Sequence, residues 1–408
     1  MFFVMLYVLD ILSGGAIYFW YVRPQLRMAK GRPIFLRVFA PTLILIMMIL
    51  AAGFFWICDH HLSPWFVFTA GSAMGLLYIW GALAVGYAIL RRIFHRESLR
   101  GFYPVFEKVW AALWVVVSIV PFIQGNIAPR WANLVLPINN WQGPPMKIVL
   151  LSDLHLGTIQ GSAYLQEVVA QTNQVDPDLV VITGDILDHY LLPAEMPALL
   201  APLVQLKPKW GTYFVLGNHD AYSDVNVLLA VLRSYKVRPL INENVIIDQR
   251  LNLAGVPDPA AQRWGKLYEP SWPLVEEQVD QRFPVVLLAH RPNFQRKIKH
   301  DLVDVMLMGH THGGQIFPFS LLVYLHNDFF VGLYGLDHQS KTPRHYPIKA
   351  VRSRQGIGLS WKPEYKWYYV TPGTGSWGPP MRLLSYREIT IITLKSSDEV
   401  AFPMEGTD

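Results

Sequence analysis

The chain has 408 residues with a formal net charge of +5 at pH 7, and 52% of its residues are hydrophobic. A single cysteine, Cys58, excludes an intrachain disulfide framework. Residues 1–145 hold 11 basic and 4 acidic residues, which leaves 24 and 26 for the remainder. The C-terminal two thirds therefore has no overall basic field that would attract nucleic acid, and we expect no nucleic-acid partner.

Four long apolar stretches come first in the chain, and each is close to the ~20 residues that a helix needs to cross a bilayer. They are residues 2–22, 35–57, 66–90 and 109–125. The mean hydropathy of +0.25 agrees with a membrane-embedded part. We predict an all-α bundle of about four transmembrane helices over residues 1–126. Asp10, inside the first stretch, is either a polar packing residue or a functional group.

The loops between these stretches differ in charge. Residues 23–37 and 91–108 each contain five Lys or Arg residues, whereas residues 58–65 contain none. Basic loops stay in the cytoplasm. The sequence therefore predicts a multi-pass inner-membrane protein whose C-terminal domain faces the periplasm or the cell exterior. If the fourth stretch, with Pro121 and Gln124, lies in the interface instead of spanning, that domain faces the cytoplasm.

Composition changes near residue 140. Residues 127–145 contain four prolines and two tryptophans, and we interpret them as a linker along the membrane surface. Residues 146–396 are long enough for one domain with its own core. Residues 397–408 form a C-terminal tail in this interpretation.

Five polar motifs in the C-terminal domain each follow a short apolar run typical of a buried strand. The motifs are SDLHLG at 152–157, TGDILDH at 183–189, LGNHD at 216–220, LAHRP at 288–292 and MGHTHGGQ at 308–315. Ligands of α/β sheets bind at the carboxyl ends of the strands, so we expect these motifs to meet there. The donors brought together are Asp153, His155, Asp185, Asn218, His290, His310 and His312. Such oxygen and imidazole donors suit a pair of divalent first-row metals such as Mn, Fe or Zn.

This ordered set of motifs resembles the calcineurin-like metallophosphoesterase family over residues 146–395. The resemblance implies an α/β fold, an αββα sandwich of two mixed sheets with helices on the outer faces. The segment PGTGSWGPPMR at 372–382 is similar to the membrane-associated bacterial branch. In the phosphoprotein phosphatase branch an arginine follows the GDxxD motif. Here His189 and Tyr190 stand at that place, which argues against protein-phosphatase activity.

The resemblance also implies a role for each motif residue. Asp153, His155, Asp185 and His312 would hold one cation, and Asp185, Asn218, His290 and His310 the other. Asp185 would bridge the two cations, with manganese as the favoured metal, and water activated between them would attack in line. His219 would protonate the leaving oxygen, and Asp188 would hydrogen-bond and orient that histidine. We interpret Asp220 as structural. His189 and Arg291 each lie in a motif and are weak candidates for a functional role, since either could be a surface residue.

The metals fix the reaction class but leave the substrate open among phosphomonoesters, phosphodiesters and pyrophosphates. Membrane tethering and the apolar segment 317–336, after the last ligands, favour a lipid-linked substrate. That segment is either an apolar wall beside the metals or a buried loop and strand. Residues 341–368, rich in basic and aromatic residues, are either a lid for anionic headgroups or a solvated loop. The alternatives are a membrane sensor or binding protein with a non-catalytic domain, which the intact ligand set argues against, and a transporter, which has little support.

Overall fold

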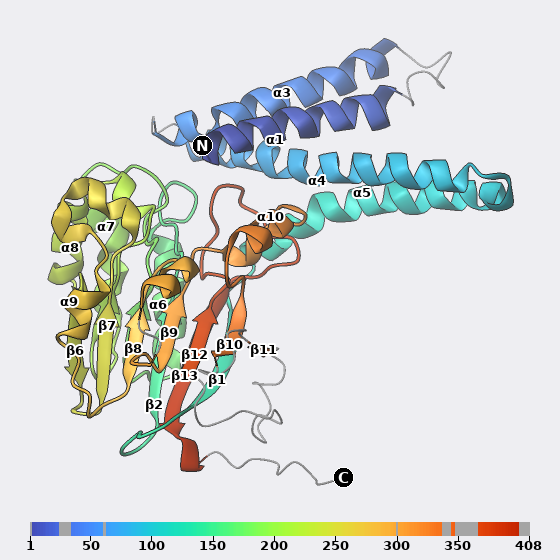
Figure 1. Cartoon of the computed structure of the whole chain (residues 1–408). Helices are drawn as coiled ribbons and strands as arrows, with labels where there is room; N and C mark the ends of the chain where they lie inside the picture. The colour runs from blue at the N-terminus through green and yellow to red at the C-terminus, as the bar shows by residue number, and fades with distance from the viewer. Residues whose placement is uncertain are drawn as a thin grey trace, which may run out of the picture. The chain divides into compact units, whose positions relative to one another are not determined.

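The computed structural model describes residues 2–23, 34–59, 63–298, 301–336, 344–346 and 366–399. The chain forms two compact units, which are described separately (Figure 1). The first unit contains Met1–Ile127 together with Gln315–Leu322 and Gly378–Ser385. The second contains Ala128–Gly314, Val323–Trp377 and Tyr386–Asp408.

The first unit is helical. Its elements are α1 (Phe2–Ala16), the π-helical η1 (Ile17–Val22), α3 (Ile34–Asp59), α4 (Pro64–Phe94), the 3₁₀ turn η2 (Glu97–Phe102) and α5 (Tyr103–Asn126). Among the described residues, α4 and α5 are long and apolar enough to cross a membrane. The described residues thus contain two membrane-capable helices rather than the predicted four or so.

Two segments from the far end of the chain belong to this helical unit. Ile316 and Leu383 form an isolated bridge between them. The backbone N–H of Arg382 donates to the carbonyl oxygen of Pro121 in α5 at 2.9 Å. Met381 is buried in an apolar cluster with Ile316 and with Ile79 of α4. Both segments lie inside the range predicted as the C-terminal domain, so the helical unit is discontinuous in sequence.

The second unit contains two mixed β-sheets. The six-stranded sheet has the order β1-β13-β2-β3-β4-β5, and the seven-stranded sheet has the order β11-β10-β12-β9-β8-β7-β6. The strands are β1 (Arg130–Ile138), β2 (Met146–Leu151), β3 (Leu179–Ile182), β4 (Thr212–Phe214), β5 (Val237–Pro239), β6 (Glu243–Ile247), β7 (Leu251–Gly255), β8 (Val285–Leu288), β9 (Val305–Met308), β10 (Gly332–Leu336), β11 (Arg344–Tyr346), β12 (Lys366–Val370) and β13 (Glu388–Ser396). All five strands predicted ahead of the motifs are present, as β2, β3, β4, β8 and β9.

Helices and 3₁₀ turns connect these strands. The helices are α6 (Ser162–Gln174), α7 (Met196–Leu200), α8 (Val225–Ser234), α9 (Trp272–Glu276) and α10 (Phe319–His326), the last of which begins in the first unit. The 3₁₀ turns are η3 (Ala201–Gln205), η4 (Asp220–Tyr222), η5 (Pro259–Trp264), η6 (Lys266–Tyr268), η7 (Pro292–Lys297), η8 (His312–Gly314) and η9 (Ser397–Glu399).

Alternate residues of the central strands enter different apolar layers. Ile148 and Leu150 of β2 pack between the two sheets, against residues such as Leu307 of β9. Val149 and Leu151 face the opposite side, in a cluster with α6 and α8. Because both faces are covered, the strands read as continuous apolar runs rather than alternating ones. The two sheets packed face to face, with helices outside, confirm the predicted α/β sandwich.

The predicted membrane-surface linker 127–145 is wrong for about half of its length. Arg130–Ile138 forms β1, which pairs in parallel with β13 along its whole length. β1 is the edge strand of its sheet, and an edge position tolerates Pro137 because no neighbour requires its missing N–H. The prolines made this segment resemble a linker. Its pairing partner lies about 260 residues later in the sequence, so no local pattern indicated the strand.

The other predictions for this half of the chain have mixed outcomes. The apolar segment 317–336 contains an exposed helix, α10, and a largely buried strand, β10. Most of the tract 341–368 lies outside the described residues, apart from β11 and the start of β12. β13 ends at Ser396, where the domain was predicted to end, and of the tail only Ser397–Glu399 is described.

Candidate metal centre

The five motifs lie at the carboxyl ends of strands from both sheets. β2, β3 and β4 are parallel neighbours in the six-stranded sheet, and β8 and β9 are parallel neighbours in the other. Five of the seven predicted ligands have a positive φ, namely Asp153 (52°), His155 (46°), Asp185 (51°), His310 (71°) and His312 (52°). Such a conformation costs about 1–3 kcal/mol in a residue other than glycine. The surrounding fold therefore holds these five residues in a backbone conformation that they would rarely adopt alone.

One group of donors contains Asp153, His155 and His312. The Nε2 atoms of His155 and His312 are 3.0 Å apart, and Nε2 of His312 lies 3.4 Å from Oδ1 of Asp153. Nε2 of His155 also lies 3.7 Å from Oδ2 of Asp185. These are the four residues predicted to hold the first cation.

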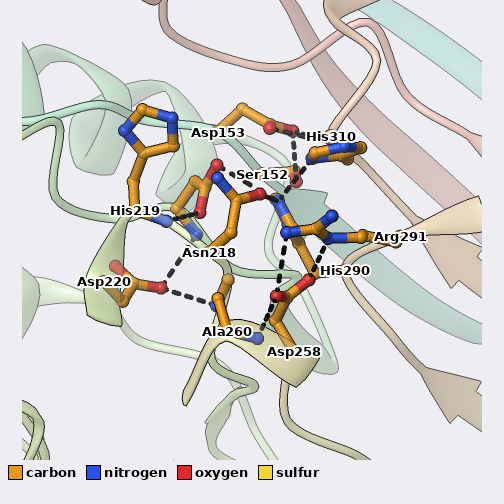
Figure 2. Close-up of polar contacts among 12 residues, drawn as sticks. Ser152, Asp153, Asn218, His219, Asp220, Asp258, Ala260, His290, Arg291 and His310 are labelled. Atoms are coloured by element: carbon orange, nitrogen blue, oxygen red, sulfur yellow. Dashed lines mark hydrogen bonds and ion pairs between the residues drawn. The ribbon is translucent and has the colours of Figure 1, made fainter. Parts of the chain in front are cut away.

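The second group contains Asp185, His290 and His310. Nε2 of His290 is 3.1 Å from Oδ2 of Asp185, 3.1 Å from Oδ1 of Asn218 and 3.2 Å from Nδ1 of His310. Figure 2 shows Asn218, His290 and His310 converging on one point. These are the four residues predicted to hold the second cation, and Asp185 again contributes Oδ2.

These separations fit metal coordination. Bonds of about 2.1 Å at right angles put two donor atoms about 3.0 Å apart, and tetrahedral angles put them about 3.4 Å apart. The observed separations of 3.0–3.7 Å fall in or near this range. The residues present therefore suit two cations chemically and geometrically, and their role as ligands remains a prediction.

A second layer of hydrogen bonds orients the imidazoles. Nδ1 of His290 lies 2.8 Å from the carbonyl oxygen of Thr183, and Nδ1 of His155 lies 3.1 Å from Oδ1 of Asp188. An acceptor at Nδ1 holds the proton there and leaves the Nε2 lone pair for a metal. Both Nε2 atoms therefore remain directed at the donor groups.

Asp220 fastens two of the motif loops together. Its fully buried carboxylate accepts hydrogen bonds from the backbone N–H groups of Asp185, Ile186, Leu187 and Gly217, at 2.7–3.1 Å. This agrees with the structural interpretation of Asp220. No larger residue fits at position 217, because a Cβ there would lie 2.2 Å from Oδ1 of Asp185. The glycine of this motif is required by the close approach of the Asp185 carboxylate.

His219 and Asp188 interact differently from the prediction. Nδ1 of His219 lies 2.5 Å from the backbone carbonyl oxygen of Asp188, not from its carboxylate. The carboxylate instead contacts Nδ1 of His155 and, at 3.4 Å, Nδ1 of His189. The sequence could not distinguish the two cases, because one residue supplies both acceptors. Asp188 thus orients a predicted metal ligand with its side chain and His219 with its backbone.

The electrostatics single out Asp185. Burial would raise its pKa, but the charge of His290 and its hydrogen bond hold the pKa well below the usual range. Burial likewise acts against protonation of His290, yet Asp185 raises the pKa of that imidazole to about 10. Burial raises the pKa of Asp153 and lowers that of His219. Asp185 and His290 thus form a buried ion pair in which the carboxylate is held ionised.

Three residues near the centre were not identified from the sequence. The ring of Tyr222 lies 4.9 Å from that of His219, and the ring of Trp377 lies 5.7 Å from it. Asp258 forms a two-pronged ion pair with Arg291, the residue after His290 (Figure 2). None of the three belongs to a ligand motif. One sequence feature could have identified Asp258 as a site residue, because it follows shortly after the apolar strand β7, as the predicted ligands follow their strands.

Comparison with known proteins agrees with this geometry. The family profile for calcineurin-like phosphoesterases matches residues 146–314. An uncharacterized metallophosphoesterase of Aquifex aeolicus is 33% identical, over 62% of this chain and 87% of its own length. The chain belongs to the calcineurin-like metallophosphoesterase family. It is therefore a metal-dependent phosphoesterase, as the motifs predicted.

The matches to two other relatives cover more of this chain than residues 146–314. A zebrafish (Danio rerio) protein named transmembrane protein with metallophosphoesterase domain is 29% identical, over 96% of this chain and 89% of its own length. A bovine (Bos taurus) protein of the same name is 35% identical, over 69% of this chain, which covers 61% of the bovine protein. Among solved structures, a purple acid phosphatase from yellow lupin has a TM-score of 0.34 at 11% identity, over 66% of this chain and 58% of its own.

Proposed function

We propose that this protein is a membrane-anchored phosphoesterase with a dinuclear metal centre. The observation that carries the proposal is the position of Oδ2 of Asp185, 3.1 Å from His290 in one donor group and 3.7 Å from His155 in the other. One carboxylate shared by two groups is the arrangement that holds two cations about 3.5–4 Å apart. Two such cations would clamp a phosphoryl group and lower the pKa of water between them.

The protein's own residues supply the rest of the chemistry. His219 keeps its Nδ1 against the carbonyl oxygen of Asp188, so its Nε2 is available to carry the proton that the leaving oxygen needs. The backbone N–H of His219 donates to Oδ1 of Asp185 at 2.8 Å, which fixes the proposed acid beside the proposed bridge. The reaction is hydrolysis of a phosphodiester, a pyrophosphate or a phosphomonoester.

Several features support a lipid-linked substrate. The two apolar helices α4 and α5, and relatives named as transmembrane proteins, indicate membrane association. α10 follows the last ligand motif in the chain and has no buried residue. Leu321 is 53% exposed and Leu325 is 78% exposed. An exposed apolar helix in a membrane-associated enzyme suits contact with acyl or prenyl chains.

Hydrolysis of an aryl phosphodiester by the purified full-length protein in detergent tests the proposal. We expect turnover with added Mn²⁺, loss of turnover with a chelator, and recovery when the metal is returned. Parallel assays with Fe²⁺ and Zn²⁺ identify the metal that works best. Protein that binds two metal ions per chain and hydrolyses no phosphoester would contradict the proposal and favour the sensor or binding-protein alternative.

The side of the membrane is a separate prediction. Five basic residues in each of the loops 23–37 and 91–108, against none in 58–65, lead us to propose that the phosphoesterase domain lies outside the cytoplasm. A reporter enzyme that works only outside the cytoplasm, fused after Asp408, should be active. A reporter that works only in the cytoplasm serves as the control at the same position. Activity of the second reporter alone would place the domain in the cytoplasm and mean an odd number of spans.

A further inference from the structure

Arg291 holds its guanidinium group rigidly beside the metal centre. Nε and Nη2 donate to the two carboxylate oxygens of Asp258 at 2.6 and 3.1 Å. Asp258 is itself fixed, since it is fully buried and Oδ1 accepts from the backbone N–H of Ala260 at 2.8 Å. The side chain of Arg291 nevertheless remains 38% exposed. Because Arg has five N–H donors, this pairing leaves donors directed at solvent.

A second guanidinium lies on the His219 side of the centre. The Cζ atom of Arg263, in η5, is 5.3 Å from the ring centroid of Tyr222, the residue whose ring contacts His219. The η5 turn is tied to η4 because Nε1 of Trp264 donates to the carbonyl oxygen of Ala221 at 2.9 Å. Among the described residues, no carboxylate forms an ion pair with Arg263. Arg263 is exposed to solvent, so its guanidinium group is accessible to an anion.

The two guanidinium groups act on the same neighbour. Burial raises the pKa of Tyr222, and the charges of Arg263 and Arg291 both oppose that rise. Arg291 also helps to lower the pKa of His310, a predicted ligand of the second cation. The carboxylate of Asp258 forms an ion pair with Arg291. Planar guanidinium groups are suited to bind phosphate or carboxylate.

We propose that Arg263, Arg291 and Tyr222 form an anion shelf, a subsite that binds a second anionic group of the substrate while the reacting phosphoryl group lies on the metals. This rests on the proposed function and narrows its substrate class. The preferred substrate is a phosphoester or anhydride whose retained part carries a further phosphate or carboxylate. Arg263 and Arg291 are specificity-determining residues, and Tyr222 supports Arg263 through its ring face.

Three p-nitrophenyl phosphodiesters test the anion shelf on the full-length protein in detergent. Their second ester group is ethyl (neutral), 2-carboxyethyl (anionic) or choline (cationic), so the leaving group and the chemistry stay constant. For the unmodified protein we expect kcat/KM to favour the anionic ester over the neutral one by about 10-fold, as one charge-assisted hydrogen bond provides. The cationic ester should be the poorest substrate.

The variants Arg263→Gln and Arg291→Gln should each reduce this preference, mainly through KM, and the double variant should abolish it. Arg263→Lys should retain most of it, because the charge remains. Arg282→Gln is the matched control, since Arg282 is an exposed arginine paired with Asp280 in the loop before β8, away from the ligand motifs. That variant should keep the full preference. Bound metal is measured for every variant.

The outcomes separate this inference from the proposed function. Equal hydrolysis of all three esters, or an unchanged preference in the double variant, would overturn the anion shelf and leave the phosphoesterase activity intact. Loss of bound metal in Arg291→Gln would assign that residue to support of the centre and remove it from the subsite. No hydrolysis of any ester by metal-loaded protein would overturn both proposals.

Discussion

The variant Asp185→Asn is expected to lose hydrolytic activity by about 10³-fold or more, because the two cations provide several kcal/mol of transition-state stabilisation. Oδ2 of Asp185 is the atom shared by both donor groups, and neighbouring imidazoles hold this carboxylate ionised. Asparagine keeps the size of the side chain but removes the charge that offsets two dications. We therefore expect bound metal to fall from two ions per chain towards none, measured by elemental analysis.

The matched control for this variant is Asp176→Asn. Asp176 also has a positive φ, of 50°, but is exposed and lies after α6, outside the donor groups. The substitution should leave metal content and activity unchanged. That result would show that replacing an aspartate with a positive φ does not by itself reduce metal binding or activity. Full activity of Asp185→Asn with two bound ions would show that this carboxylate is not a bridging ligand.

The variant His219→Ala is expected to separate acid catalysis from metal binding. General acid catalysis contributes about 10²–10⁴-fold when the leaving oxygen needs a proton. His219→Ala should therefore lose that factor on an alkyl or lipid phosphoester and very little on a nitrophenyl ester, whose leaving group departs as a stable anion. Metal content should stay near that of the unmodified protein. The measurement is kcat/KM for the two substrates under identical metal loading.

Two results would contradict this role for His219. Equal losses on both substrates would mean that the imidazole stabilises the phosphoryl oxygens instead of protonating the leaving group. Loss of a metal ion would make it a ligand, an outcome that the geometry permits because His219 lies in a group with His155 and Asp185.

The structure changes the expectation for Asp188. If the Asp188 carboxylate oriented His219, as the resemblance implies, Asp188→Asn would show a milder form of the His219→Ala pattern. Since His219 is held by the backbone carbonyl, the substitution leaves that contact in place. It alters the partner of Nδ1 of His155 instead. Asp188→Asn should therefore weaken metal binding and affect both substrates to a similar degree.

The sequence by itself determined the strands that precede the motifs, and it predicted the donors that follow them. Runs such as KIVLL before Asp153 and DVMLM before His310 are local signals, since a strand covered on both faces must be apolar throughout and must end where polar atoms leave the core. The order of the motifs also determined the family. These inferences required no knowledge of which strands are neighbours.

Only the tertiary structure decided how distant segments combine. The donors come from two sheets rather than one, and they meet because the sheets pack face to face. The pairing of β1 with β13 and the inclusion of Gln315–Leu322 in the helical unit join residues far apart in the chain. The choice between the carboxylate and the carbonyl of Asp188, and the pairing of Arg291 with Asp258, depend on ångström-scale positions. Local composition cannot specify such contacts, because their energies arise only once the chain has folded.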